Sequence, residues 1–205
     1  MKKTYEAIIR ILFLLIVAAF FAGYASAAQW VKTDPADVNL TGVWTTYTTT
    51  TEIFCTGISG VIIHHDGTAW ESMDSGAVVD LNAIWGTSAT DIFAVGDNAT
   101  ILHYNGIAWS SQLSAGNNLN AVWGTPESNV YAVGNSGTIL HYDGTTWSSM
   151  TSGTGLNLNG VWGSSATDVF AVGENLTILH YDGSVWTAFT PTSSTYVDLN
   201  AVWGY

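Results

Sequence analysis

Histidines at a regular spacing are the first residues of this sequence that could do chemistry. His103, His141 and His180 each lie in a phrase reading ILHYNG or ILHYDG, and His64 lies in the related phrase IIHHDG, where His65 follows it. Metal ligands must all lie within bonding distance, about 2 Å, of one ion. Residues at the same place in successive structural repeats stand too far apart for that. We therefore expect each imidazole to be structural, hydrogen-bonded to a neighbouring loop or blade. The His64-His65 pair is the one place where a surface metal stays open.

Carboxylates and amides also recur at two fixed places in the sequence. One set opens an apolar run after a Ser/Thr-rich loop, and its members are Glu52, Asp91, Asn129 and Asp168. The other set follows the histidine phrase, and its members are Asp66, Asn105, Asp143 and Asp182. Side-chain oxygens at such places cap the backbone amides of turns, which is the role we expect. Ca²⁺ is the alternative for these carboxylates, although no D-x-D-x-D-G ligand ladder is present. No cofactor is otherwise predicted.

Tryptophans define the repeat that must position these residues. One series recurs at a nearly constant interval, and its members are Trp44, Trp85, Trp123, Trp162 and Trp203. A second series lies between them, at Trp70, Trp109, Trp147 and Trp186. Such an interval, of about 40 residues, marks one supersecondary unit repeated along the chain. Five copies at one structural position indicate core packing between units rather than a ligand platform.

Each unit contains four short apolar runs bounded by turn residues. In the third unit these runs are LNAVWG, NVYAVG, TILHY and WSSM, with turns NSG and DGTT after the second and third. We call the four runs strands A to D. Runs such as DIFAVG and DVFAVG are apolar on both faces, which indicates a sheet covered on both sides. A four-stranded antiparallel unit of this length is typical of a β-propeller blade. A parallel β-helix is the competitor, but its coils are shorter and lack tight hairpins.

The predicted fold is therefore all-β, a propeller of four-stranded antiparallel blades. Four complete blades are expected at about 40–76, 81–114, 119–152 and 158–190, within a repeat region of 28–205. A partial blade is expected from a D strand at 29–33 and an A strand at 199–205. Because A is innermost and D outermost, these two strands cannot pair with each other. We expect the natural protein to continue past Tyr205 as a larger propeller. A four-bladed ring closed by spare strands is the alternative.

The repeated phrase W-G-[ST]-S-A-T-D-[IV]-F-A-V-G, followed by T-I-L-H-Y-[DN]-G-x-x-W, carries a family resemblance. It resembles bacterial secreted propellers with BNR (Asp-box) repeats of the photosystem II assembly-factor-like kind. The turn HYDGTTW, which ends at Trp147, is one residue tighter than the usual Asp-box. Propellers of this kind serve as enzymes, binding modules and assembly factors, so the resemblance implies the fold more than the function.

The segment 1–27 reads as a secretory signal peptide. Lys2 and Lys3 precede an apolar run at 11–22, and Ala25-Ser26-Ala27 follows it. This is the order of a cleavable signal, so the predicted location is secreted, periplasmic or cell surface. An uncleaved membrane anchor is the rival interpretation. The mature chain is not expected to insert into a membrane.

The charge balance excludes some partners. The chain has a formal net charge of −12, and loss of the segment 1–27 makes it more negative, because three of the four Lys and Arg residues leave with that segment. Such a surface repels phosphate backbones, so nucleic acid is not an expected partner. Cations or neutral ligands fit better.

In propellers the D-A and B-C connections emerge on one face, which is conventionally the ligand face. Here these connections differ most between repeats and are rich in hydroxyls and amides, which suit a glycan or an extracellular or cell-surface protein. The candidate ligand-binding residues are Asp97, Asn98, Asn135, Ser136, Glu174, Asn175 and Tyr196. The predicted function is a secreted binding or scaffolding module acting through this face.

No catalytic residue is predicted. A sialidase clamps its substrate carboxylate with arginines, and the mature chain has none. Cys55 replaces the Ala of AVG in strand B, so it is expected in the core rather than as a nucleophile. Paired carboxylates for glycoside hydrolysis stay open, because their separation depends on the fold. The alternative function is a hydrolase or lyase whose catalytic residues lie in missing blades or a further domain.

Overall fold

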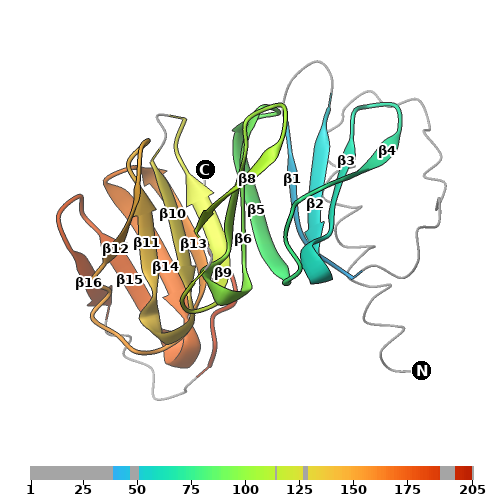
Figure 1. The fold of residues 1–205 in the computed structure, drawn as a ribbon. Helices are drawn as coiled ribbons and strands as arrows, with labels where there is room; N and C mark the ends of the chain where they lie inside the picture. Colours follow the sequence, from blue (N-terminus) through green and yellow to red (C-terminus); the bar gives the residue numbers. More distant parts are fainter. Residues whose placement is uncertain (1–38, 47–50, 114, 127–128, 190–196, 205) are drawn as a thin grey trace. The chain divides into compact units, whose positions relative to one another are not determined.

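The computed structural model describes residues 39–46, 51–113, 115–126, 129–189 and 197–204, and it separates Met1–Asn39 from a compact unit at Leu40–Tyr205. The compact unit contains four antiparallel sheets of four strands each (Figure 1). The first sheet has β1 (Leu40–Thr45), β2 (Ile53–Gly57), β3 (Ile62–His65) and β4 (Trp70–Met73). The second has β5 (Leu81–Ser88), β6 (Asp91–Gly96), β7 (Ile101–Tyr104) and β8 (Trp109–Leu113). The third has β9 (Leu119–Gly124), β10 (Val130–Gly134), β11 (Ile139–Tyr142) and β12 (Trp147–Met150). The fourth has β13 (Leu158–Ser165), β14 (Asp168–Gly173), β15 (Ile178–Tyr181) and β16 (Trp186–Phe189).

The strands of each sheet follow one another in chain order, so each sheet is a meander of strands A, B, C and D. The A strands of consecutive sheets contact each other, β1 with β5, β5 with β9 and β9 with β13. The four sheets therefore follow one another in sequence order with their A strands next to one another (Figure 1). This arrangement confirms the predicted all-β propeller blades with strand A innermost.

The core lies between the sheets rather than within any one of them. Three buried clusters join the first sheet to the second, the second to the third and the third to the fourth. Strand β6 shows why the B strands read as continuous apolar runs: residues on both of its faces, such as Ile92, Phe93 and Ala94, are buried. The D strands, in contrast, have exposed central residues because they form the outer edge of each blade.

Aromatic side chains continue these contacts outward from strand B. The B-strand ring of one sheet meets the C-strand tyrosine of the next, with centroid separations of 6.2 Å for Phe54 and Tyr104 and 5.4 Å for Phe93 and Tyr142. The D-strand Trp147 also meets Phe93 edge to face at 5.9 Å. Such tilted and edge-to-face pairs are favourable because the positive edge of one ring faces the negative face of another. The rings hold neighbouring blades together along their full width.

The inner strands are held by a tryptophan of one blade against a glycine of the next. A Cβ atom at Gly86, Gly124 or Gly163 would lie 3.2, 2.8 or 2.7 Å from Cη2 of Trp44, Trp85 or Trp123, respectively. The WG pairs of β5, β9 and β13 thus receive the indole of the preceding blade, whereas β1 reads WT and contributes only its indole to the following blade. Trp44, Trp85 and Trp123 pack against the buried clusters, as the sequence predicted. The prediction is wrong for Trp203, which is 79% exposed because no described blade lies beyond it.

Cys55 lies in mid-strand in β2, opposite Val43, and is buried. Burial disfavours the thiolate and raises the pKa of Cys55 to about 12. This confirms the prediction that Cys55 is a core residue, since a thiol with so high a pKa is a poor nucleophile at neutral pH.

Residues 199–204 were expected as an A strand, but they belong to no sheet of the described structure. The reason is that no described strand lies beside them to complete a hydrogen-bonded ladder. The expected signal peptide at 1–27 and D strand at 29–33 lie outside the described residues. In the described part of the chain, no helix has the length and apolar character needed to cross a membrane.

We predict that Gly124→Ala destabilises the fold by about 2 kcal/mol, because over-packing a tight contact forces neighbours to shift. The added Cβ would lie 2.7 Å from the Asn129 carbonyl oxygen and 2.8 Å from the Trp85 ring. Urea unfolding followed by circular dichroism measures the change. Gly155→Ala is the control, since nothing lies within 4 Å of its Cβ position. Equal stability of the two variants would contradict the proposed role of the Trp-Gly contact.

Candidate functional site

Six of the seven predicted ligand-binding residues lie on three of the four described B-C turns, which all share one construction. These turns are η1 (Ile58–Gly60), η2 (Asp97–Ala99), η3 (Asn135–Gly137) and η4 (Glu174–Leu176). The middle residue of each turn has a left-handed backbone with φ of 53° to 56°, and these residues are Ser59, Asn98, Ser136 and Asn175. All four middle residues are exposed. The turns therefore present one small polar side chain each at the same end of successive blades.

Each turn is clipped by the residue that precedes the A strand of the next blade. The backbone amide of Asn98 donates to Oδ1 of Asn118 at 3.0 Å, and the amide of Ser136 donates to Oδ1 of Asn157 at 2.8 Å. The same bond joins Ser59 to Asp80 at 2.8 Å and Asn175 to Asp198 at 3.1 Å. A left-handed residue leaves its amide pointing out of the turn, where a side-chain oxygen can accept from it. We call these four bonds the turn latch.

In three of the four turns, a second bond ties the turn to the residue that precedes the A strand of its own blade. The backbone amides of Asp97, Asn135 and Glu174 donate to the carbonyl oxygens of Asp80, Asn118 and Asn157, each at 2.9 Å. The latching residues were missed at the sequence level. Their signal is nevertheless present, because each copy reads [DN]-L-N at the start of strand A.

In three turns, the side chain of the first residue also accepts a hydrogen bond from a nearby asparagine. Oδ1 of Asp97 accepts from Nδ2 of Asn82 at 3.1 Å, and Oδ1 of Asn135 accepts from Nδ2 of Asn120 at 3.0 Å. Oε1 of Glu174 accepts from Nδ2 of Asn157 at 2.8 Å. These three predicted site residues are half-buried and hold their turns in place. The exposed tips Asn98, Ser136 and Asn175 are the members of the predicted set best placed to touch a ligand, and Tyr196 lies outside the described residues.

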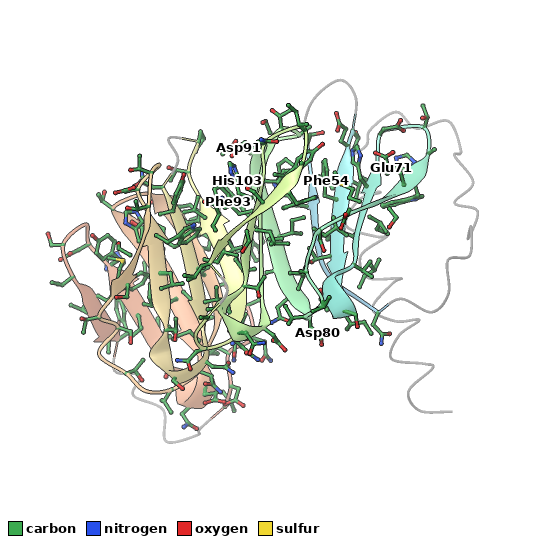
Figure 2. The ribbon with its side chains drawn as sticks, viewed as in Figure 1. Phe54, Glu71, Asp80, Asp91, Phe93 and His103 are labelled. Carbon is green, nitrogen blue, oxygen red and sulfur yellow. The ribbon has the colours of Figure 1, made fainter. Side chains whose placement is uncertain are left out.

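The opposite end of the blades holds the repeated histidines of strand C, each stacked on an aromatic ring and bonded to an acidic or amide side chain; these are His64, His103, His141 and His180. In the second blade, Nε2 of His103 lies 2.7 Å from Oδ1 of Asp91, and the ring stacks on Phe93 at 4.4 Å (Figure 2). Oγ1 of Thr87 donates to the other oxygen of Asp91 at 2.6 Å. The fourth blade repeats the set with His180, Asp168 and Phe170. The third blade has His141 bonded to Asn129 at 3.1 Å and stacked on Tyr131.

These contacts give the histidines hydrogen-bonded partners, as predicted, but the partners lie at the start of strand B in the same blade rather than in a neighbouring loop or blade. They also revise the role of the partners. Asp91 and Asp168 were expected to cap backbone amides, but the structure pairs them with a histidine and a hydroxyl. The reason is the pairing of strands B and C, which brings the two side chains to the same end of adjacent strands. In the first blade His64 lies between two carboxylates, Glu52 at 3.0 Å and Glu71 at 3.1 Å.

No group of three or more His, Cys, Asp and Glu side chains in the described residues is arranged to hold a metal ion. His64 has both ring nitrogens against carboxylates, while Nδ1 of His65 accepts from the Gly67 amide at 3.0 Å. The pair therefore does not present two free nitrogens to one ion. We assign no chemical role to the His64-His65 pair.

The C-D turns confirm the capping predicted from sequence. Oδ1 of Asp143 accepts from the Thr145 hydroxyl at 2.7 Å and from the amides of Thr145 and Thr146 at 2.8 Å. Asp66, Asn105 and Asp182 accept equivalent amide bonds. The Thr145 hydroxyl first, and then the two amides, lower the pKa of Asp143 to about 2, because these donors stabilise the charged form.

Two cavities lie between blades in the described structure. One, of about 630 Å³, is lined by Trp44, Trp85 and hydroxyl residues from 45–46 and 87–90. The other, of about 550 Å³, is lined by His141, Trp186 and residues of β12 and its neighbouring loops. The described lining of neither contains a carboxylate, so neither offers the paired acids of a glycoside hydrolase.

The fold and these turns define the class of protein: the chain is built as a β-propeller. Among solved structures, YCF48 bound to D1 peptide matches with a TM-score of 0.60 at 15% identity, covering 78% of this chain and 57% of that one. YCF48 from Cyanidioschyzon merolae matches with a TM-score of 0.58 at 15% identity, covering 80% and 60%. The WD40 propeller domain of Doa1 matches with a TM-score of 0.65 at 10% identity, covering 80% and 58%.

At these identities the likeness shows the propeller fold alone. The chain spans about 57% to 60% of the length of these structures. No family model and no curated protein matches the sequence. Similarity to a photosystem II assembly-factor propeller thus agrees with the resemblance seen in the repeats, at the level of the fold.

We predict opposite effects of exchanging glycine and alanine at the third position of two latched turns. Ala99 has φ of 53°, which costs an L-residue about 1 kcal/mol, so Ala99→Gly should leave stability unchanged or raise it slightly. Gly137→Ala should lower it by more than about 2 kcal/mol, because its Cβ would overlap the Thr154 carbonyl oxygen. Urea unfolding of both variants measures the difference. Similar losses in both would show that the backbone geometry of the two turns is not as described.

We also predict that Asp143 stays ionised down to about pH 2, which NMR titration of its side-chain carboxyl carbon can measure. A lowered folded-state pKa adds stability above the ordinary value of about 3.9. That contribution is lost as pH falls through the folded value. Thr145→Val removes the hydroxyl donor and should move the pKa of Asp143 upward. An unchanged titration in Thr145→Val would contradict the assigned cause.

Proposed function

We propose that this chain is a secreted scaffold propeller that binds a protein partner, through the face formed by the B-C turns and the D-A connections. The observation that carries the proposal is the turn latch. Its bonds fix the backbone of each turn and leave the side chains of Asn98, Ser136 and Asn175 exposed in a regular series. Rigid presentation lowers the entropy cost of binding, so such a series suits an extended partner.

Charge favours a basic or uncharged partner segment. All four Lys and Arg residues of the chain lie at or before Lys32, so the formal charges of the blades at neutral pH come from carboxylates. On the turn face itself, Asp80, Asp97, Glu174 and Asp198 lie beside the exposed tips. A basic peptide would be attracted by this field and an acidic one repelled.

The structural neighbours support a peptide or protein rather than a glycan as the partner. One of them is a propeller described as YCF48 bound to D1 peptide, so a propeller of comparable fold takes a peptide. Secretion is supported by the order of charged, apolar and small residues at the N-terminus. The peptide or protein partner and the secretion of the chain are both parts of this proposal.

The test is binding of the chain to arrays of basic, neutral and acidic peptides and to a glycan array. We expect basic peptides to bind, with affinity that falls as salt is raised, because screening weakens charge attraction. The combined variant Asn98→Ala, Ser136→Ala and Asn175→Ala should weaken binding about tenfold, equivalent to about 1.4 kcal/mol.

Ile107→Ser is the matched control, because Ile107 is 88% exposed on a C-D turn at the other end of its blade. It should bind as the unaltered chain does. Binding lost equally in the control, or binding to glycans alone, would overturn the proposal.

A further inference from the structure

The C-D turn of the second blade contains an Asn-Gly pair where the other three blades have Asp-Gly. The four pairs are Asp66-Gly67, Asn105-Gly106, Asp143-Gly144 and Asp182-Gly183. Each glycine has a positive φ, of 87° to 94°, which is a conformation that favours glycine. At Gly106 a Cβ would also lie 2.8 Å from Cγ2 of Thr90. The shape of the turn therefore requires a glycine after Asn105.

An asparagine followed by glycine can lose its side-chain amide without an enzyme. The backbone nitrogen of the glycine attacks Cγ of the asparagine and gives up its proton, a cyclic imide forms, and ammonia leaves. Water then opens the ring at one of its two carbonyl carbons. Asparagine and water are thereby converted to ammonia and an aspartyl or isoaspartyl residue. Glycine favours the attack because it has no Cβ to shield its nitrogen.

The turn around Asn105 supplies conditions that promote this ring closure. Oδ1 of Asn105 accepts from the backbone amides of Ile107 and Ala108, each at 3.0 Å. These two donors would stabilise the negative charge that develops on Oδ1 when Cγ is attacked, as the amides of an oxyanion hole do. The Gly106 amide has no hydrogen-bond partner among the described residues, so its nitrogen is free to attack. Asn105 is exposed, so water can reach the imide.

The aspartyl product would fit the turn. Asp66, Asp143 and Asp182 accept the same two backbone amide bonds, at 2.7 to 3.0 Å. A threonine hydroxyl at Asp66 and Asp143, and the backbone amides at all three, lower the pKa of these carboxyls, because the donors stabilise the charged form. A carboxylate at position 105 would find the same two amides.

The sequence contains a second Asn-Gly pair, Asn159-Gly160, in a setting that opposes the reaction. Nδ2 of Asn159, which would leave as ammonia, donates to the Leu199 carbonyl oxygen at 3.0 Å. Gly160 is buried in β13 and pairs with Val172 of β14. Ring closure there must wait until the sheet opens locally. The fold thus separates two pairs that have the same intrinsic chemistry.

We propose that Asn105-Gly106 is a self-modifying site, at which the folded turn converts Asn105 to an aspartyl or isoaspartyl residue with water as the co-reactant. The modification adds a negative charge on a C-D turn, at the end of the blade opposite the B-C turns. It does not rest on the proposed function, so the failure of either leaves the other untouched.

The test incubates the folded full chain at mildly alkaline pH. Ion-exchange chromatography follows the added charge, and peptide mapping by mass spectrometry follows the two Asn-Gly pairs. Asn105 should react at least about tenfold faster than Asn159, because only the second pair must wait for local opening. In urea both pairs should react at similar rates. Equal rates in the folded chain, or no reaction at Asn105 while the unfolded chain reacts, would overturn the proposal.

Asn105→Asp is the first control variant. It should elute with the aspartyl form of the incubated chain, unfold at the same temperature as the unaltered chain, and form no further acidic species at this turn. If the acidic species still accumulates at the original rate in this variant, its source lies elsewhere and the proposal is wrong.

Two substitutions at Ile107 test the part played by the turn. Ile107→Pro removes one amide donor to Oδ1 and should slow the reaction of Asn105 about fivefold, the usual effect of one hydrogen bond. Ile107→Ser keeps that amide and should react as the unaltered chain does. Thermal unfolding checks that both variants are folded. Equal rates in the two folded variants would contradict the assigned role of the amide, and the comparison of Asn105 with Asn159 stands even if the proline variant does not fold.

Discussion

The contact between the tryptophan of one inner strand and the glycine of the next is the constraint on which the rest of the structure depends. It brings consecutive inner strands so close that a side chain at Gly124 or Gly163 would overlap an indole. The aromatic rings of strands B, C and D then fill the wedge that opens outward between sheets. In a WG pair, the glycine contacts the indole of the preceding blade and the tryptophan contacts the glycine of the following one. The same contact can therefore recur at each junction between blades. It holds residues 199–204 even where no sheet forms.

Hydrogen bonds between polar groups fix the position of the turns, as the tryptophan contacts fix the position of the inner strands. An Asp or Asn before each strand A accepts the amide of a left-handed turn residue in the preceding blade. This bond couples the turn face to the spacing of the blades. The side chains of Asp97, Asn135 and Glu174 contribute to the same framework. In the proposed function, recognition is left to the exposed tips and to the D-A connections that differ between blades.

The blades hold together with little help from opposite charges. Among the described residues, the ion pairs formed all involve histidine with Asp or Glu. Other carboxylates accept hydrogen bonds within their own turns. At Asp143, one hydroxyl and two amide groups donate to Oδ1. Packing and hydrogen bonds, many of them accepted by carboxylates, therefore carry the stability of the blades. The carboxylates of the blades have no Lys or Arg beside them in the sequence after Lys32, so their negative field would attract the basic partner proposed above.

The sequence by itself determined the blade repeat, the order of strands A to D and the capping at Asp143, because these depend on local periodicity and turn chemistry. It also indicated the burial of Cys55 and the structural use of the histidines. The partner of Asp91, the latch made by Asn118 and Asn157, and the exposure of Trp203 were decided by the tertiary structure alone. The physical reason is that each depends on which strand or blade lies alongside. A repeat shows that neighbours are alike, but only the packed structure shows which side chains of neighbouring blades meet.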